Sequence, residues 1–356
     1  MDDFSISSPL ITRSKGQSKS RHKINLPIYP EADILFRVPS ISQFAKMLEI
    51  APVNVKTRFL VFFDTHRLKC PPEFVSHQYA DVAIHRGDLT TESKIDECKA
   101  LIRFLRAVNA SLKLVIAGNH DFTMDTPTFR RKVAEAQFLD PQLIQKFYGS
   151  YGEARELFSA EKEMGITFLD EGIHSFRLQN GGLLNVYASP YTPLCGDWGF
   201  QYHRDYGHDF RIQDVDVVMT HGPPKGIMDY TDSGQRAGCQ HLFKAMARAK
   251  RPLMHCFGHI YEGWGAKLVR WRPKISPEPS HLTDIDNEHN VVISRISTSR
   301  NKGNPTECST TSHCSGDPNP LKRGSETLFM NAALEGFHDP LIQPPWLVDI
   351  ERLAAV

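Results

Sequence analysis

Short apolar segments recur along this chain, and each is followed at once by polar residues. The segment 112–117 is an example, because it stops at Gly118 and continues with Asn119, His120 and Asp121. Apolar runs of about four to eight residues bounded by turn residues are typical of buried strands. The same pattern predicts further strands at residues 58–63, 81–85, 215–220 and 252–257.

Helical spacing separates several of these strands. Ile95, Cys98, Ile102 and Leu105 fall on one face of a helix that Thr90 or Thr91 would cap. A strand, a helix and a second strand in this order predict a parallel sheet with right-handed crossovers. Further helices are predicted at 41–50, 129–147 (broken or kinked at Pro141), 154–163 and 239–250. Further strands are predicted at 166–169, 291–296 and 325–330, and at 175–178 and 183–188 as a hairpin around Asn180-Gly181-Gly182.

Loss of periodicity sets the predicted domain bounds. Residues 1–25 are polar without a period and are predicted to be a disordered tail. Residues 271–323 are rich in Ser, Thr, Pro, Asn and His and are predicted to be a mobile low-complexity insertion, with 309–320 as linker. Residues 26–270 together with 324–356 would form one large domain. The loop 189–202, dense in Pro, Gly and aromatic residues, is expected to be functional or to form a wall of a cleft.

The composition argues against several classes of protein. The 356 residues carry a net charge of +1, which gives no field that favours nucleic acid or a membrane surface. Seven scattered cysteines without a C-x-x-C pair indicate reduced thiols instead of a disulfide scaffold. No apolar run reaches the roughly 20 residues of a membrane span, and the N-terminus does not resemble a secretory signal. We therefore expect a cytoplasmic protein, with the basic patch 13–23 as a weaker organelle or nuclear signal.

The polar residues at the five strand ends share one chemistry. They are carboxylates, an amide and imidazoles: Asp64, His66, Asp88, Asn119, His120, His221 and His259. Oxygen and nitrogen ligands of this kind suit divalent Zn, Mn and Fe ions. Asp64 and His66 would point the same way, since side chains on a strand alternate with a period of two. Each piece alone is a common pattern, but the ordered set at strand ends predicts one shared metal site.

In this order and spacing, the residues resemble the calcineurin-like metallophosphoesterases. The matching motifs are Asp64-x-His66, Gly87-Asp88, Gly118-Asn119-His120-Asp121, His221-Gly222 and Gly258-His259. Flanking runs such as Ile-His-Arg-Gly-Asp-Leu-Thr, Gly-Asp-Trp and Thr-His-Gly-Pro-Pro are similar to the metallophosphoesterase-domain-containing (MPPED-type) branch. The resemblance covers about residues 58–270 and the strand at Glu326. It implies an α/β fold in which a two-sheet β-sandwich is flanked by helices, with four layers in the order α/β/β/α.

The resemblance also implies a role for each matching residue. Two divalent ions (Mn, Fe or Zn) would form a dinuclear centre. Asp64 and His66 would hold the first ion, Asp88 would bridge both ions, and Asn119, His221 and His259 would hold the second. His120 would protonate the leaving oxygen or clamp the phosphoryl group, and Asp121 would orient His120. Asn119, His120 and Tyr261 would contact the substrate.

Tyr261 departs from the family motif Gly-His-x-His, in which a second histidine completes the shell of the first ion. A phenol with a pKa near 10 is a poor metal ligand at neutral pH unless the ion itself ionises it. We therefore expect weak occupancy of the first ion and reduced turnover, with the phenol hydroxyl in contact with a phosphate oxygen.

Two classes of function stay open at this point. The first is a metal-dependent phosphohydrolase acting on small phosphodiesters such as cyclic nucleotides, as the resemblance implies. The second is a nucleotide-binding or regulatory module that lost most of its turnover at Tyr261. A protein phosphatase fits less well because an arginine-rich phosphate grip is missing, and a nuclease because no basic stripe with interleaved aromatic residues appears. The aromatic residues of the long loop would either stack on a base or pack under the loop: Tyr191, Trp198, Phe200 and Tyr202.

Overall fold

The structure is a computed structural model, and it describes residues 54–62, 77–296, 308–333 and 343–355. The chain divides into two compact units, residues 1–50 and 51–356, and all described residues belong to the second unit. The tail predicted at 1–25 and the helix predicted at 41–50 lie outside the described residues. Within the described ranges, every helix is too short or too polar to span a bilayer.

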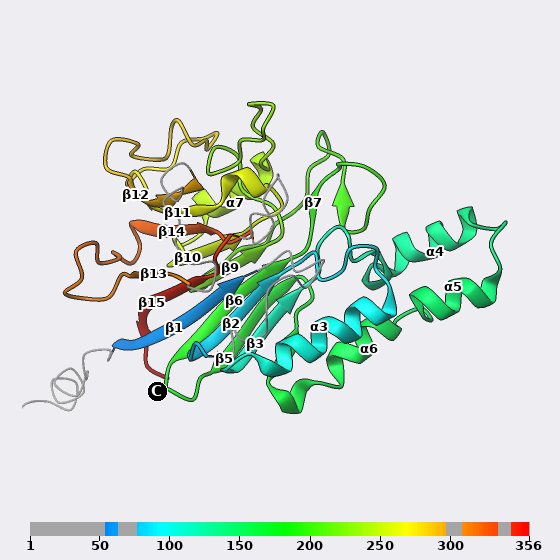
Figure 1. Cartoon of the computed structure of the whole chain (residues 1–356). Coiled ribbons are helices and arrows are strands. Elements are labelled where there is room, and N and C mark those ends of the chain that lie inside the picture. The colour runs from blue at the N-terminus through cyan, green and yellow to red at the C-terminus, as the bar shows by residue number, and fades with distance from the viewer. Residues whose placement is uncertain (1–53, 63–76, 297–307, 334–342, 356) are drawn as a thin grey trace, which may run out of the picture. The chain divides into compact units, whose positions relative to one another are not determined.

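Two large sheets form the centre of this unit (Figure 1). The six-stranded sheet has the order β13 (Ser309–Ser312), β15 (Trp346–Leu353), β1 (Asn54–Phe62), β2 (Ala80–Arg86), β3 (Ala110–Ile116), β4 (Ile166–Phe168). The seven-stranded sheet has the order β12 (Val291–Arg295), β11 (Gly265–Arg270), β14 (Glu326–Asn331), β10 (Met254–Phe257), β9 (Val217–Thr220), β6 (Leu183–Ser189), β5 (Gly172–Arg177). Two short strands, β7 (Thr192–Pro193) and β8 (Gln201–Tyr202), pair within the long loop.

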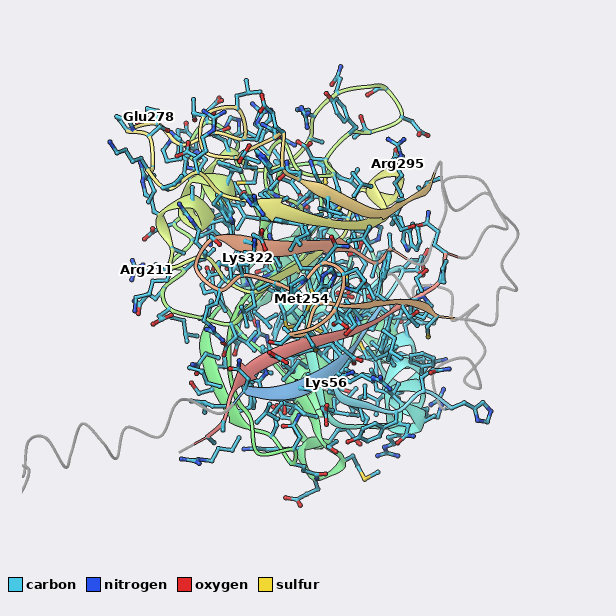
Figure 2. All side chains as sticks on the ribbon, turned by 90° about the vertical axis from the view of Figure 1, so that its left-hand side faces the viewer. Lys56, Arg211, Met254, Glu278, Arg295 and Lys322 are labelled. Carbon is cyan, nitrogen blue, oxygen red and sulfur yellow. The ribbon has the colours of Figure 1, made fainter. Side chains whose placement is uncertain are left out.

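The central strands are apolar on both faces because each face is covered. On β1, Phe59 and Val61 face the second sheet, whereas Leu60 and Phe62 pack on the helical side. Met254 of β10 belongs to the core between the sheets and lies among densely packed side chains in Figure 2. Strands that are covered on both faces have continuous apolar sequences, so these strands could be predicted from the sequence.

Helices cover the outer face of each sheet (Figure 1). Helices α3 (Ile95–Ala107) and α6 (Glu153–Ser159) pack on the six-stranded sheet, and α7 (Gln240–Arg248) packs on the other. Helices α4 (Thr126–Glu135) and α5 (Pro141–Tyr148) extend away from the sheets as a pair. Single 3-10 turns occur at η1 (Phe122–Met124), η2 (Lys162–Met164) and η3 (Tyr261–Gly263). The predicted two-sheet α/β/β/α architecture is confirmed.

Most predicted elements are confirmed, including the parallel run β1–β2–β3–β4, the β5–β6 hairpin and the edge strand β12. The predicted Thr90 or Thr91 cap of α3 is wrong. The helix begins after Lys94, and the Glu97 carboxylate accepts from the backbone N–H groups of Thr91 at 3.2 Å and Lys94 at 2.9 Å. The break predicted at Pro141 within the helix 129–147 is confirmed, because Asp140 caps a new helix that starts at Pro141.

Three strands of the large sheets were not predicted, β11, β13 and β15, and neither was the short pair β7 and β8 within the predicted loop 189–202. Ser309–Ser312, part of the predicted linker 309–320, forms β13 and pairs in parallel with β15. The strand β15 pairs antiparallel with β1 over eight residues, and its Trp346 stacks on Trp264 with ring centroids 5.2 Å apart. The boundaries of the tail, the domain (26–270 with 324–356) and the insertion (271–323) stay a prediction.

Candidate metal centre

Two pairs of parallel strands deliver four of the six predicted ligands to one place. Asp88 follows β2 in the six-stranded sheet, and Asn119 follows β3. His221 directly follows β9 in the seven-stranded sheet, and His259 follows β10. The two strands of each pair run parallel, with β2 beside β3 and β9 beside β10. The carboxyl ends of both sheets therefore meet at one site, as the strand-end pattern predicts.

Three of these residues form a group that could hold a metal ion. One ligand atom each from Asp88, His221 and His259 lies within 4.8 Å of the others. His221 Nε2 is 2.7 Å from Asn119 Oδ1 and 3.4 Å from Asp88 Oδ1, and the Asp88, Asn119 and His221 side chains are almost fully buried. Two oxygen acceptors converging on an imidazole nitrogen favour a positive charge between them, which a proton or a divalent ion supplies. The donor set of carboxylate, amide and imidazole therefore fits Zn, Mn or Fe.

The backbone of this centre is strained, and glycine makes the close approach possible. Asp88 and His259 have the left-handed φ values of 46° and 65°, which cost non-glycine residues free energy and cluster at functional sites. A Cβ atom on Gly118 would lie 2.2 Å from Asp88 N and 2.7 Å from His221 Cε1. A side chain at position 118 would thus force Asp88 and His221 apart.

Burial and neighbouring charges set the protonation of the two histidines. Burial, with the nearby His221 charge, lowers the pKa of His259 to about 3, so its imidazole is neutral at pH 7. Burial alone would also lower the pKa of His221, but the charge and hydrogen bond of Asp88 raise it. His221 Nδ1 lies 3.1 Å from the Arg86 carbonyl oxygen, so Nδ1–H can donate there and leave Nε2 to the centre.

His120 lies at the edge of this group. Its backbone N–H donates to Asp88 Oδ1 at 3.1 Å, and its ring Nδ1 lies 2.9 Å from the Thr91 carbonyl oxygen. The His120 imidazole also stacks on the Trp198 indole, with 4.0 Å between ring centroids. The ring is therefore held both at one edge and on one face.

The Asp121 carboxylate binds backbone groups of the neighbouring loops, whereas Nδ1 of His120 is paired with the Thr91 carbonyl oxygen. Its carboxylate is fully buried and accepts from Gly118 N at 2.7 Å, Leu89 N at 3.0 Å, Thr90 N at 2.9 Å and Thr90 Oγ1 at 2.7 Å. Burial, with the nearby Asp88 charge, raises the pKa of Asp121 to about 6. Since Thr91 follows Thr90 and holds the His120 ring, any orientation of His120 by Asp121 would pass through this loop.

The predicted roles of Asp64, His66 and Tyr261 are not tested by the structure. Asp64 and His66 lie outside the described residues, so their roles stay predictions. Tyr261 begins the turn η3, and its half-buried side chain packs against the core between the sheets. Its predicted contact with a phosphate oxygen also stays a prediction.

The loop 189–202 contributes residues that sequence reasoning did not assign to the centre. Phe200 is buried and Tyr191 packs beside it, as the packing alternative predicts, and Tyr202 joins the core beneath α7. Cys195 Sγ lies 3.6 Å from His259 Nε2, although 64 residues separate the two in sequence. Trp198 contacts His120 in the way described above. The only signal in the sequence was the density of aromatic residues and glycine in this loop.

Comparison with known proteins identifies the family. Residues 57–263 match the model of the calcineurin-like phosphoesterases. Human metallophosphoesterase domain-containing protein 1 is 30% identical over 217 residues, which are 59% of this chain and 62% of that protein. A UPF0046 protein of Caenorhabditis elegans is 29% identical over 193 residues, 52% of this chain and 47% of that protein. The chain thus spans less than two thirds of the length of these relatives. The family match covers more than half of the chain, so the chain belongs to the calcineurin-like phosphoesterase family, as its motifs predicted.

Proposed function

We propose that this protein is a metal-dependent phosphoesterase that hydrolyses small phosphodiesters, with cyclic nucleotides as candidate substrates. The observation that carries the proposal is the convergence of Asp88, His221 and His259 ligand atoms within 4.8 Å, with Asn119 Oδ1 2.7 Å from His221 Nε2. Family membership supports hydrolysis of a phosphoester as the class of reaction. The substrate and the reducing, cytoplasmic setting belong to the proposal.

In this proposal, Asn119, His221 and His259 would hold one divalent ion, Asp64 and His66 would hold the other, and Asp88 would serve as a ligand to both. Bound divalent ions supply Lewis acidity, which neutralises charge on the phosphoryl oxygens and strengthens water as a nucleophile at neutral pH. Manganese is our first choice for assays, with iron and zinc as alternatives. The neutral imidazole of His259 is ready to bind a cation without first losing a proton.

His120 is proposed as the general acid. As the bond from phosphorus to the leaving oxygen breaks, the protonated imidazole would give its proton to that oxygen. A positioned general acid contributes about 10²–10⁴-fold to rate. Asp121 would keep the loops of Asp88 and His120 together, and Asn119, His120 and Tyr261 would face the substrate.

The alternative is a nucleotide-binding or regulatory module with low turnover. The observation that favours it is Tyr261, which stands at the place of a family histidine and packs against the core between the sheets. Under this alternative the first ion is held weakly, while nucleotide still binds.

The test combines element analysis with hydrolysis of bis(p-nitrophenyl) phosphate in added Mn²⁺. We expect bound metal and hydrolysis in the wild type, loss of both in Asp88→Asn, and loss of hydrolysis with metal retained in His120→Gln. Glu135→Gln, an exposed residue of α4, is the matched control. Bound metal and nucleotide binding without hydrolysis of any phosphodiester would favour the alternative, and a wild type that binds no divalent metal would contradict both.

A further inference from the structure

A segment of the loop 189–202 that contains none of the predicted metal ligands packs against His120. The Trp198 indole stacks on the His120 imidazole with 4.0 Å between the ring centroids and 29° between the ring planes. The Thr91 carbonyl oxygen lies 2.9 Å from Nδ1 of the same imidazole. An aromatic ring fixed at one edge and stacked on one face has few rotamers left.

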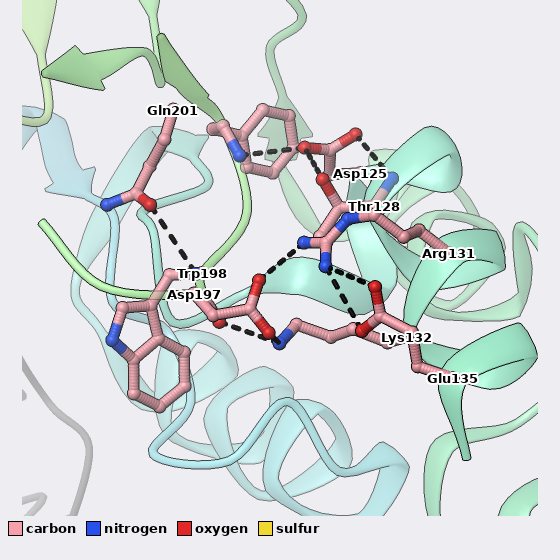
Figure 3. Close-up of polar contacts among 9 residues, drawn as sticks. Asp125, Thr128, Arg131, Lys132, Glu135, Asp197, Trp198 and Gln201 are labelled. Carbon is pink, nitrogen blue, oxygen red and sulfur yellow. Dashed lines mark hydrogen bonds and ion pairs between the residues drawn. The ribbon is translucent and has the colours of Figure 1, made fainter. Parts of the chain in front are cut away.

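Asp197 fastens this segment to helix α4. The Asp197 carboxylate pairs with the Arg131 guanidinium at 2.5 Å and with Lys132 Nζ at 2.7 Å, and its carbonyl oxygen accepts from Lys132 Nζ at 2.6 Å (Figure 3). The Lys132 ammonium also lies 5.2 Å from the centroid of the Phe122 ring and 6.0 Å from that of Trp198. One carboxylate thus binds two cations of α4 beside the indole.

Backbone contacts fix the same segment to the loop that carries the candidate site. Gly199 N–H donates to the Asn119 carbonyl oxygen at 2.9 Å, and Phe200 N–H donates to Asp125 Oδ2 at 2.7 Å. Asp125 is also the N-cap of α4, as Figure 3 shows with Thr128. A Cβ on Gly199 would lie 2.8 Å from Phe122 Cα, so the approach is as close as glycine allows. We call residues 197–200 the clamp segment.

We propose that the clamp segment positions the His120 imidazole, with Asp197 and Trp198 as positioning residues for phosphoester hydrolysis. The kinetic consequence rests on the proposed function, but the ring contact is independent of it. The indole face that covers His120 is not available to a substrate base, which separates this role from a base-stacking wall. Asp197 and Arg131 are largely exposed, with 59% and 46% of their side chains accessible. Exposed ion pairs of this kind add little stability, so a loss of rate in their variants would report a change in the position of the clamp segment and not unfolding.

Four variants test the proposal: Trp198→Leu removes the stacked ring, Trp198→Phe keeps a ring, Asp197→Asn weakens the ion pairs, and Glu135→Gln is the control. Glu135 also pairs with Arg131, at 3.0 Å, but has no bond to the clamp segment. The first readout is the NMR chemical shift of the His120 ring protons in metal-free protein, assigned by their loss in His120→Gln. The second is kcat and KM for bis(p-nitrophenyl) phosphate with Mn²⁺.

We expect the His120 ring protons to lose the upfield shift from the indole in Trp198→Leu and to lose part of it in Asp197→Asn. We expect kcat to fall about 10²-fold in Trp198→Leu and about tenfold in Asp197→Asn, with KM within about twofold, because misplacing a catalytic group costs rate more than affinity. Trp198→Phe should restore most of kcat. Glu135→Gln should match the wild type in both readouts.

Unchanged His120 shifts in Trp198→Leu and Asp197→Asn would overturn the proposal. A raised KM with unchanged kcat in Trp198→Leu would also overturn it, since Trp198 would then bind substrate. If the wild type hydrolyses no phosphodiester, the proposed function fails, and the NMR readout alone decides on the clamp segment. If Trp198→Leu does not fold, Trp198→Phe and Asp197→Asn decide through the same two readouts.

Discussion

Replacement of Asp121 by Ala removes both carboxylate oxygen atoms, whereas replacement by Asn removes one. Comparing the two variants should show how much each oxygen atom contributes to the stability of the centre. Oδ2 accepts from the backbone N–H groups of Gly118 and Leu89, at 2.7 Å and 3.0 Å. Oδ1 accepts from the backbone N–H and the hydroxyl of Thr90, at 2.9 Å and 2.7 Å. The carboxylate therefore ties the end of β3 to the loop that follows Asp88.

The expected cost differs between the two variants. Asp121→Ala leaves three buried N–H groups without an acceptor, and each such group costs about 1–3 kcal/mol. Entry of water into the space reduces this sum, so we expect about 3–5 kcal/mol of lost stability. Asp121→Asn keeps one oxygen and strands one N–H, because the Thr90 hydroxyl can rotate to accept from the amide. Its cost is expected near 1 kcal/mol, since loss of the charge also relieves the burial and the Asp88 repulsion that raise the Asp121 pKa to about 6.

Urea denaturation followed by circular dichroism measures these free energies, and calorimetric titration with Mn²⁺ measures the metal affinity. Asp121→Ala should weaken Mn²⁺ binding at least tenfold, as an order-of-magnitude expectation for lost ligand support, and Asp121→Asn should do so less. Glu135→Gln, an exposed pair on α4, should change neither quantity. If Asp121→Ala unfolds at the same urea concentration as the wild type and binds Mn²⁺ equally well, the carboxylate does not organise these loops.

Three further predictions follow from the geometry. Gly118→Ala should abolish metal binding because its Cβ would lie 2.2 Å from Asp88 N. Gly316→Ala meets no atom within 4 Å, so despite the backbone strain of its φ of 91° it should keep metal binding. Equal Mn²⁺ affinity of the two variants would contradict this. The pKa of His259 is lowered from its ordinary value of 6.5 to about 3 in the folded protein, so between these pH values the unfolded chain binds more protons than the folded one. The free energy of unfolding of the metal-free protein should therefore fall by up to about 1.4 kcal/mol per pH unit as pH decreases from 6.5 toward 3. Denaturation at several pH values should show this slope reduced in His259→Gln, and parallel curves would refute the assignment. Tyr261→His should raise both metal content and hydrolysis rate, and an unchanged metal content would show that our account of this position is wrong.

The strands that carry the centre were predictable because their apolar runs are unambiguous. β1, β2, β3, β9 and β10 each have both faces covered, so hydrophobicity alone marks them. The polar residues after them could be assigned to one site because parallel strands place their carboxyl ends together. Asp88, Asn119, His221 and His259 are indeed neighbours, even though 102 positions separate Asn119 and His221 in sequence.

Contacts that depend on long-range geometry were not predictable. β13 is Ser309–Ser312, a polar segment that becomes a strand only because β15 offers it an edge. The cap of α3 comes from Glu97 inside the helix, since Thr90 is engaged by Asp121. The stacking of Trp198 on His120 occurs beside ion pairs between Asp197 and α4, and no periodic pattern encodes such contacts.

Anomalous X-ray diffraction from crystals grown with Zn²⁺, measured on both sides of the zinc absorption edge, tests the central claim most directly. We predict a strong peak about 2.0–2.2 Å from oxygen or nitrogen atoms of Asp88, His221 and His259. A second, weaker peak is predicted beside Asp88, for the second ion of the proposed centre. Zinc found only elsewhere on the protein, with no peak between Asp88, His221 and His259, would contradict the account.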